Sequence, residues 1–434
     1  MSKLAILGGH PTRTERFPIE TPQINDEDIQ SVLSALQERC LSIFSSSRIQ
    51  EFEDAFAKYI GVKHAIAVTS GTASLQASLA AAGISAGDHV IVPVYTYAAT
   101  VNAILLQGAV PTFVDVDPST FNLDPLLIEE HISSKTKAIV IVDLFGNPMP
   151  RSEVLSLVNK HKLVLIEDCA QSTGARIHGR QVGGFGIGCH SFGEIKNITS
   201  AEGGMITTND DEIARKARLV RHSGEIWRKT HSTTIGQSPN LLVEMIEGID
   251  YEMVGHNYRM NALQASLGRS QLKRIDQINQ QRRDIASYYR NKIDSLLIEL
   301  PYIHPDAEPV FNRFVIKVSP RLGLSRNAFL AALIQEGVPA GVYYPRPLNR
   351  ATVFAKYSSE LTHVPSFPNA ELVCNSQILL PCYPGLSESH IADVVTAINK
   401  ILDSASDIET VMEVENLVQN ARAVYFGQFF SNPV

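Results

Sequence analysis

Short apolar segments alternate with helical segments through the first half of the chain. Segments of strand character cover residues 64–68, 89–93, 110–116, 137–143 and 163–171. Helices are expected over residues 25–38, 47–59, 75–82 and 152–160, and after Asp124-Pro125. Since parallel strands need crossover connections, which helices supply, the alternation predicts an α/β fold with a large doubly wound sheet, parallel or mixed.

The pattern changes after about residue 301. The elements expected there are a strand over 312–318, a helix over 325–336, a strand over 341–344 and a helix over 387–404. A long helical segment precedes them, over residues 262–297, and is expected to connect two domains. The second half of the chain therefore predicts a smaller α+β domain.

The length of 434 residues also favours two domains, because a single hydrophobic core stops growing well below that size. We expect a large domain over residues 1–262 and a small domain with the connecting helix over 263–404. Residues 405–434 form a C-terminal extension with an apolar end. The stretch 226–248 has no clear period and is interpreted as a long loop or lid.

The composition is that of an ordinary soluble globular protein. A net charge of −7 gives no sign of a nucleic-acid-binding surface, and no apolar run is long enough to span a membrane. The five cysteines show neither metal-ligand spacing nor a disulfide framework, so no metal is expected and a reducing compartment is favoured. With no signal peptide apparent, a cytoplasmic location is predicted.

A small hydroxyl-and-glycine turn joins the strand 64–68 to the next helix. It contains Ser70, Gly71 and Thr72. Such a turn presents free N–H groups and the positive end of a helix to an anion, usually a phosphate. An ordinary strand-to-helix turn with a hydroxyl cap is the alternative.

Two further strands have side chains at or just after their ends that could contact a cofactor. Tyr97 comes after strand 89–93, where an aromatic ring could stack on a flat cofactor, although a core tyrosine fits equally well. The strand 163–171 carries Glu167 and Asp168 near its end. A carboxylate such as Asp168 can pair with the nitrogen of a pyridine ring, and a helix N-cap is the alternative.

Lys196 lies among small, polar and apolar residues in the stretch 191–204, which ends in a Gly-Gly pair. A lysine in a partly desolvated pocket favours its neutral amine, which is a nucleophile. This is what a Schiff-base lysine requires. The alternative is a surface lysine in a loop before a strand.

Four stretches occur together and in order: 70–72, 167–171, 191–204 and 255–260. As an ordered set they resemble the DegT family of sugar aminotransferases, which are fold-type I enzymes that use pyridoxal 5′-phosphate (PLP). The resemblance covers most of the chain, from about Leu4 to Leu402. Departures from the family pattern include 44–48, where a Gly-Pro turn is usual, and Asn349 in place of histidine.

The resemblance implies catalytic and ring-binding roles for four residues. Lys196 would form a Schiff base with PLP and move the proton at the reacting carbon. Asp168 would pair with the pyridinium nitrogen and keep the ring an electron sink. Tyr97 would stack on the ring, and Gln171 would lie beside the ring hydroxyl.

The resemblance also implies how the phosphate group is held. Gly71, Thr72 and Ser191 would bind it through backbone amides and hydroxyls. Asn257 resembles a family asparagine that reaches the phosphate from the neighbouring subunit. A homodimer with shared active sites is therefore implied.

The activity implied by the resemblance is transfer of an amino group from glutamate or glutamine to a keto-sugar or keto-cyclitol. Residues 195–204 look like those of nucleotide-sugar aminotransferases, whereas the opening 4–11 looks like the branch that acts on keto-cyclitols. One alternative is a non-transaminating PLP enzyme, either a dehydratase or an aromatising synthase. Family dehydratases have histidine in place of the lysine, so Lys196 argues against that branch. A non-catalytic sensor is the remaining alternative, and the sequence argues against it because no helix-turn-helix module and no basic patch is visible.

Overall fold

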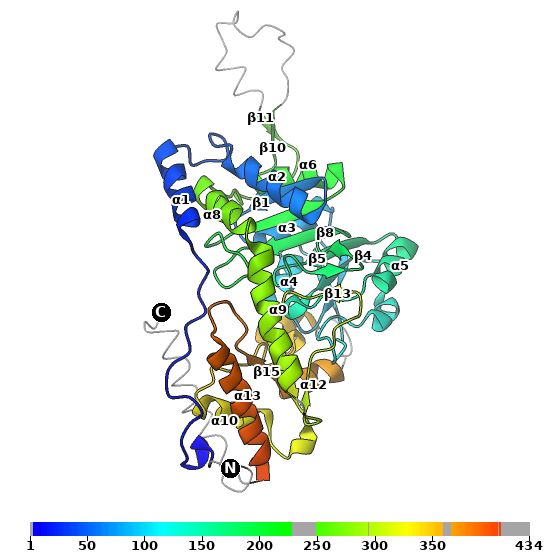
Figure 1. Ribbon diagram of the computed structural model, residues 1–434. Coiled ribbons are helices and arrows are strands. Elements are labelled where there is room, and N and C mark those ends of the chain that lie inside the picture. The colour runs from blue at the N-terminus through cyan, green and yellow to red at the C-terminus, as the bar shows by residue number, and fades with distance from the viewer. Residues whose placement is uncertain (1–2, 228–248, 294, 359–365, 407, 409–434) are drawn as a thin grey trace, which may run out of the picture.

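A mixed seven-stranded sheet forms the centre of the computed structural model, which describes residues 3–227, 249–293, 295–358, 366–406 and 408 (Figure 1). Its strand order is β1-β9-β8-β5-β4-β2-β3. The strands β3, β2, β4, β5 and β8 are parallel, and β9 runs antiparallel to both of its neighbours. Their bounds are β1 His64–Val68, β2 His89–Pro93, β3 Val110–Val114, β4 Thr136–Val142, β5 Val164–Asp168, β8 Ile187–Ser191 and β9 Gly204–Thr208. The predicted fold class is confirmed.

Helices cover both faces of this sheet, because successive side chains of a strand point to opposite faces. In β1, Ile66 and Val68 belong to one buried cluster with α3, α4 and α6, whereas Ala65 and Ala67 belong to another with α2 and α8. The helices around the sheet are α1 Asp26–Glu38, α2 Arg48–Ile60, α3 Gly71–Ala81, α4 Ala98–Leu106, α5 Ser152–His161, α6 Asp211–Arg221 and α8 Ala262–Leu272.

A smaller antiparallel sheet, of order β12-β14-β15, lies toward the C-terminal part of the chain. Together with α9, α10 and α13 it encloses a separate apolar cluster. The bounds are β12 Ile298–Glu299, β14 Phe314–Val318, β15 Gln377–Leu380, α9 Ile275–Lys292, α10 Arg326–Gln335 and α13 Glu388–Asp403. Further short elements are β6 Arg176–Ile177, β7 Arg180–Gln181, β13 Ala307–Glu308, α11 Thr352–Ser358, α12 Pro368–Ser376 and the 3-10 turns η1 Ala5–Leu7, η4 Leu144–Gly146, η5 Pro320–Leu322 and η6 Leu348–Arg350.

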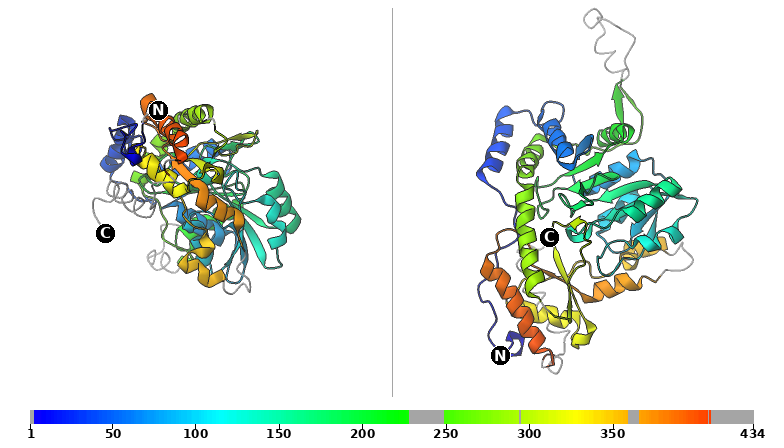
Figure 2. Two further views of the ribbon diagram at one scale, coloured as in Figure 1. Left: turned by 90° about the horizontal axis from the view of Figure 1, so that it is seen from below. Right: turned by 45° about the vertical axis from the view of Figure 1, so that its right-hand side comes forward.

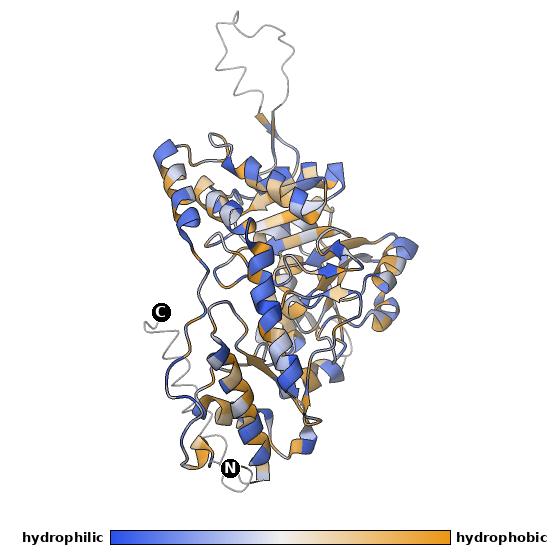
Figure 3. Ribbon diagram, in the orientation of Figure 1, coloured by the Kyte–Doolittle hydropathy of each residue, from blue (hydrophilic) through white to orange (hydrophobic). Residues whose placement is uncertain are grey.

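Helix α9 connects the two parts of the molecule, as Figure 2 shows. Its first turns place Ile275 and Ile278 in the cluster beside the large sheet, and its later turns place Ile285 and Tyr289 in the cluster of the small sheet. Hydrophilic residues cover much of its outer face (Figure 3). The expected connecting role is therefore present, and the domain boundaries at residues 262 and 404 stay predictions.

Three predicted elements differ from the structure. The single helix over 262–297 is two helices, because Arg274 leaves the helical conformation and its guanidinium pairs with the buried Asp28 at 2.5 Å. After Asp124 there are only two 3-10 turns, η2 Pro125–Leu127 and η3 Glu129–His131. The predicted strand over 341–344 is a single bridge from Gly341 to Leu379. It is flanked by prolines, which cannot donate a ladder hydrogen bond.

The N-terminal segment packs against the small sheet rather than the large one. Leu4 is fully buried in the apolar cluster of that sheet. The carboxylate of Glu336, also fully buried, accepts hydrogen bonds from the amides of Ala5 and Thr12, both at 2.8 Å. Lys400 Nζ lies 2.8 Å from the same carboxylate. One buried side chain thus joins the beginning of the chain to its last described helix.

Two regions interpreted from the sequence lie largely outside the described residues. Of the predicted lid, only the start belongs to a described element, the hairpin of β10 (Glu225–Trp227) with β11 (Ile249–Tyr251). The extension after residue 404 is described only at 405, 406 and 408. Within the described part of the chain, no helix combines the length and the apolar character needed to cross a membrane.

Candidate active site

A cavity of about 530 Å³ opens at the carboxyl edge of the parallel strands. This edge is where ligands bind in open α/β folds. Seven residues predicted from the sequence line it together: Gly71, Thr72, Tyr97, Asp168, Gln171, Ser191 and Lys196. The predicted residues come from four separate segments, so it is the fold that brings them into one site.

Lys196 lies in the turn after β8, and its amide donates to the Gly193 carbonyl at 3.0 Å. The next residue anchors this turn, since the amide side chain of Asn197 bonds to those of Asn279 at 2.6 Å and Asn312 at 2.9 Å. Burial lowers the pKa of Lys196 to about 8, against the opposing charge of Asp168. Near neutral pH the lysine therefore has an accessible neutral amine, which a Schiff base requires.

Asp168 is the last residue of β5 and is 6% exposed. Thr100 Oγ1 donates to its Oδ2 at 2.9 Å, and the amide of Ala170 donates to its Oδ1 at 3.1 Å. Burial raises the pKa of this carboxyl, and these two hydrogen bonds oppose the rise. A cationic ring nitrogen beside the carboxylate would favour the ionised form.

Glu167, the other acid near the end of this strand, does not line the cavity. Its carboxylate accepts from the amides of Phe185 at 2.8 Å and Gly186 at 2.9 Å. It also pairs at 3.2 Å with Arg151, which lies 2.6 Å from Asp143. Because neighbouring strand residues face opposite sides, one acid supports the fold and the other serves the cavity.

The turn before α3 forms the anion-binding end of the cavity. Ser70 caps the helix, with its hydroxyl accepting from the amide of Ala73 at 3.1 Å. The amides of Gly71 and Thr72 fall in the first turn, where no intrahelical partner exists. A β-carbon at position 71 would lie 2.6 Å from Ser191 Cβ, so glycine permits the end of β8 to close against this turn. Free amides at a helix N-terminus suit a phosphate.

Two aromatic rings and an amide form the remaining wall. Tyr97 precedes α4, and its side chain is 60% exposed, which leaves the ring free to face a flat ligand. Its ring centroid lies 6.2 Å from that of Tyr344. Gln171 accepts from the Phe145 amide at 2.7 Å and donates to the Tyr344 hydroxyl at 3.1 Å. The glutamine is thus fixed in orientation at the cavity wall.

Asn257 lies outside this cavity. It is exposed and makes an antiparallel bridge with His222 beyond the end of α6. Its predicted contact with the phosphate in a neighbouring subunit stays a prediction.

Three residues at the site were missed from the sequence: Thr100, Arg313 and Tyr344. Thr100, in the first turn of α4, follows the N-cap residue Tyr97 by three positions, and this spacing could have indicated it. Arg313 stands just before β14, in the part of the chain that was expected to form the small domain. No local pattern marks Arg313, because its place at the cavity depends on how the two sheets meet.

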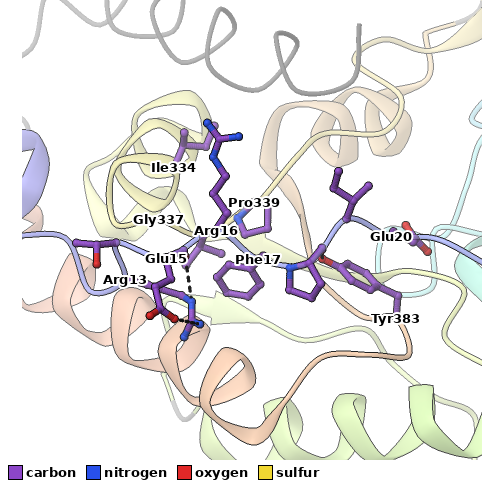
Figure 4. Close-up of a pocket in the computed structure, with 13 residues that line it drawn as sticks. Arg13, Glu15, Arg16, Phe17, Glu20, Ile334, Gly337, Pro339 and Tyr383 are labelled. Atoms are coloured by element: carbon purple, nitrogen blue, oxygen red, sulfur yellow. Dashed lines mark hydrogen bonds and ion pairs between the residues drawn. The ribbon is translucent and has the colours of Figure 1, made fainter. Parts of the chain in front are cut away.

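A second cavity, of about 210 Å³, lies beside the N-terminal segment (Figure 4). Its walls include Phe17, Pro339 and Tyr383, with Arg16 and Glu20 along the same segment. Neither Lys196 nor Asp168 lines it. The titratable groups suited to catalysis therefore gather in the larger cavity.

Within the described residues, no group of three or more His, Cys, Asp or Glu side chains is placed to hold a metal ion.

The residues of the larger cavity fit pyridoxal phosphate. The helix end at Gly71 suits the phosphate of the cofactor, and Asp168 can pair with its ring nitrogen. Tyr97 can stack on its ring face, and Lys196 can react with its aldehyde. Fold and site together define an aminotransferase that uses this cofactor. Residues 22–399 match the family model of the DegT/DnrJ/EryC1/StrS aminotransferases, and the chain belongs to that family.

Curated and solved relatives agree with this assignment. The chain is 33% identical to GDP-perosamine synthase of Caulobacter vibrioides, over 89% of this chain and 98% of the relative. It is 34% identical to the UDP-N-acetyl-3-dehydro-alpha-D-glucosamine 3-aminotransferase of Acidithiobacillus ferrooxidans, over 87% and 95%. An aminotransferase structure from Psychrobacter cryohalolentis superposes with a TM-score of 0.81 at 28% identity, covering 90% of this chain and all of that one (100%).

Proposed function

We propose that this enzyme transfers an amino group from glutamate or glutamine to a keto-sugar. The observation that carries the proposal is the presence of Lys196 and Asp168 in one cavity beside an anion-binding helix end. A lysine whose pKa is lowered to about 8 by burial can act as nucleophile, base and acid near neutral pH. These are the functions that amino transfer requires of one side chain.

Each residue of the cavity then has a defined task. Bound pyridoxal phosphate supplies the electron sink for chemistry at the amino-bearing carbon. Lys196 moves the proton to and from that carbon in the donor and in the product. Asp168 binds the protonated ring nitrogen, and Thr100 holds the carboxylate in place. Gly71 and Ser191 bind the phosphate and so fix the distance from the helix end to the lysine.

The choice of a keto-sugar over a keto-cyclitol rests on the relatives. The two curated relatives above are named for a GDP-linked and a UDP-linked sugar, and a third, from Aneurinibacillus thermoaerophilus, for a dTDP-linked one. We therefore place a nucleotide-linked keto-sugar first. Residues 195–204, which look like those of nucleotide-sugar aminotransferases, support the same choice.

We also propose that the active enzyme is a homodimer in which Asn257 serves the neighbouring site. One face of α1 leaves Ile29, Leu33 and Leu36 each more than 40% exposed, at helical spacing. Phe44, close to Arg259 and His222, is 69% exposed. Contiguous exposed apolar residues of this kind mark protein interfaces, and a second copy of the chain would cover them. A cytoplasmic location stays a prediction.

An absorbance spectrum of the purified holoenzyme tests the function. Glutamate, glutamine and alanine are added in turn, and the visible band of the bound cofactor is followed. We expect one donor to bleach the band and a nucleotide-linked keto-sugar to restore it. Alanine serves as the control donor, since it shares the reacting group but lacks the side-chain carbonyl.

The other outcomes separate the alternatives. A visible band that no donor changes would favour a non-transaminating PLP enzyme, such as an aromatising synthase. A stable band without turnover on any substrate would favour a non-catalytic sensor. Lys196 argues against a dehydratase, because family dehydratases have histidine at this position, but it does not argue against a lysine-containing aromatising enzyme.

A further inference from the structure

Arg313 lines the active-site cavity from the side of the small sheet. Its side chain is 12% exposed, and its amide donates to the carbonyl of Phe145 at 3.3 Å. Phe145 in turn donates its amide to Gln171, a residue of the opposite wall. The backbone of Arg313 is therefore fixed to the cavity rather than free at a surface.

The charge around Arg313 is not balanced. Glu20 Oε1 accepts from Arg313 Nη1 at 2.8 Å and from Arg282 Nη2 at 3.2 Å. Arg282 is only 4% exposed, so two nearly buried guanidinium groups share one carboxylate. Burial of an uncompensated charge is costly, and an anion bound beside Arg313 would remove the cost.

Donor capacity also remains on Arg313. Its guanidinium has five N–H donors in a planar fork that matches a carboxylate. Among the described residues, the hydrogen-bond acceptors found for it are Glu20 and the carbonyl of Asn312, both bonded to Nη1, and the guanidinium lies 5.8 Å from the centroid of the Tyr343 ring. The donors on Nε and Nη2 remain, so a bidentate partner can still be accommodated.

Arg313 lies close to the reacting lysine. Its sequence neighbour Asn312 donates to the side chain of Asn197, the neighbour of Lys196, at 2.9 Å. The positive charge of Arg313 also contributes to the low pKa of Lys196. An anion at Arg313 would therefore stand near the carbon whose amino group is transferred.

Two anions enter this active site under the proposed function. The amino donor has a carboxylate one bond from its reacting carbon, whereas the diphosphate of a nucleotide-linked sugar lies several bonds from the reacting keto group. The phosphate of the cofactor belongs at the helix end of Gly71 and Ser191. The proximity of Arg313 to Lys196 favours the donor carboxylate.

We infer that Arg313 binds a carboxylate of the amino donor and thereby selects amino acids for the first half of the reaction. This inference rests on the proposed transamination. Glu20, in the N-terminal segment, acts as a positioning residue that orients the guanidinium through its hydrogen bond at 2.8 Å. Arg282 completes the arrangement by holding Glu20 from the other side.

The test compares the wild-type holoenzyme with Arg313→Gln in single-turnover reactions with amino donors alone. The rate of bleaching is measured with glutamate, with glutamine and with isoglutamine, in which the α-carboxylate is an amide. We expect Arg313→Gln to lower the rate at limiting glutamate by roughly a hundredfold, because loss of one partner of a buried charge pair costs several kcal/mol. The visible band before donor addition should be unchanged.

The three donors identify which carboxylate is bound. If Arg313 holds the α-carboxylate, the wild type discriminates against isoglutamine and the variant loses that discrimination. If Arg313 holds the side-chain carboxylate, the wild type discriminates between glutamate and glutamine, and the variant loses that discrimination. Equal discrimination by both enzymes would overturn the inference.

Calorimetric binding of UDP, GDP and dTDP tests the diphosphate as the rival ligand. We expect the same affinities in the wild type and in Arg313→Gln. A loss of nucleotide affinity in Arg313→Gln with unchanged bleaching by glutamate would overturn the inference in favour of the diphosphate. Arg321→Gln, at an exposed arginine just after β14, is the matched control and should leave both measurements unchanged.

Arg313→Lys covers the case in which the glutamine variant does not fold. Lysine keeps the charge but loses the planar fork, so a smaller slowing confined to donor bleaching is expected. Bleaching by Arg313→Lys at the wild-type rate, with unchanged discrimination between the donors, would overturn the inference. If the wild-type enzyme reacts with no donor, the proposed transamination itself is overturned. If the wild type reacts and Arg313→Lys reacts equally fast, only the inference about Arg313 is overturned.

Discussion

The hydroxyl of Thr100 donates to Oδ2 of Asp168 at 2.9 Å, from the first turn of α4 to the end of β5. Both residues are nearly fully buried. Burial raises the pKa of Asp168, and the hydrogen bond from Thr100 opposes that rise by favouring the carboxylate. The threonine therefore helps to keep Asp168 ionised, which is the state that binds a protonated ring nitrogen.

Thr100→Val should keep the fold and the cofactor but slow turnover by roughly tenfold to a hundredfold, since a hydrogen bond to a charged group contributes about 1.5–3 kcal/mol. Steady-state rates and the visible spectrum measure both effects. Thr396→Val removes a hydroxyl that donates to the Ala392 carbonyl within α13, far from the cavity in the sequence, and should leave the rate unchanged. An unaltered rate in Thr100→Val would show that Asp168 needs no support from this hydroxyl.

Lys196→Ala should abolish turnover while the protein still binds pyridoxal phosphate without a covalent link. The amine is the nucleophile, and no neighbouring side chain at the cavity replaces it. Borohydride reduction followed by peptide mapping of the wild type should place the cofactor on Lys196. Recovery of the cofactor on another lysine would contradict the assignment.

The reaction of the apoprotein with added pyridoxal phosphate should depend on pH with a midpoint at about 8. Burial lowers the pKa of Lys196 to this value from an ordinary 10.5, and only the neutral amine attacks an aldehyde. The observed rate should therefore rise as the pH increases through 8 and level off above it. Stopped-flow absorbance measures the profile, and a midpoint near that of an exposed lysine would contradict the buried position.

Mixing two inactive variants tests the shared active site. In a heterodimer of Lys196→Ala with Asn257→Ala, one site combines a wild-type Lys196 with a wild-type Asn257 from the partner. We expect activity to return on mixing after subunit exchange, because the two defects fall in the same site and leave the other intact. Continued inactivity of the mixture, with exchange shown by mass spectrometry, would place Asn257 in the service of its own chain.

Five of the seven strands of the large sheet could be predicted because each is a short apolar run with a turn after it, whereas β8 and β9 were not among the predicted strands. The segments predicted over 89–93 and 163–171 are examples, and the structure has parallel strands there, at His89–Pro93 and, shorter than predicted, at Val164–Asp168. The helix over 262–297 was predicted as one element because its polar composition hides the break at Arg274. That break depends on Asp28, which lies far away in the sequence.

Some residues of the candidate site could be predicted from the sequence, and others could not. Lys196 and Asp168 stand in local patterns that indicate their chemistry, and the structure places both in one cavity. Thr100 and Arg313 act through partners from distant segments, and only Thr100 has a local signal, its spacing of three residues from Tyr97. The opposite directions of Glu167 and Asp168 were missed because the strand was assigned without assigning its faces.

Glu336 joins the amides of Ala5 and Thr12 to Lys400, and this has a consequence for the order of events during synthesis. Ala5 and Thr12 cannot make these hydrogen bonds until Glu336 has been synthesised, and Lys400 follows later still. Glu20, whose carboxylate orients Arg313, belongs to the same segment. All strands of the large sheet precede residue 209, so that sheet can assemble before Arg313 and the donor-binding wall of the active site have been synthesised.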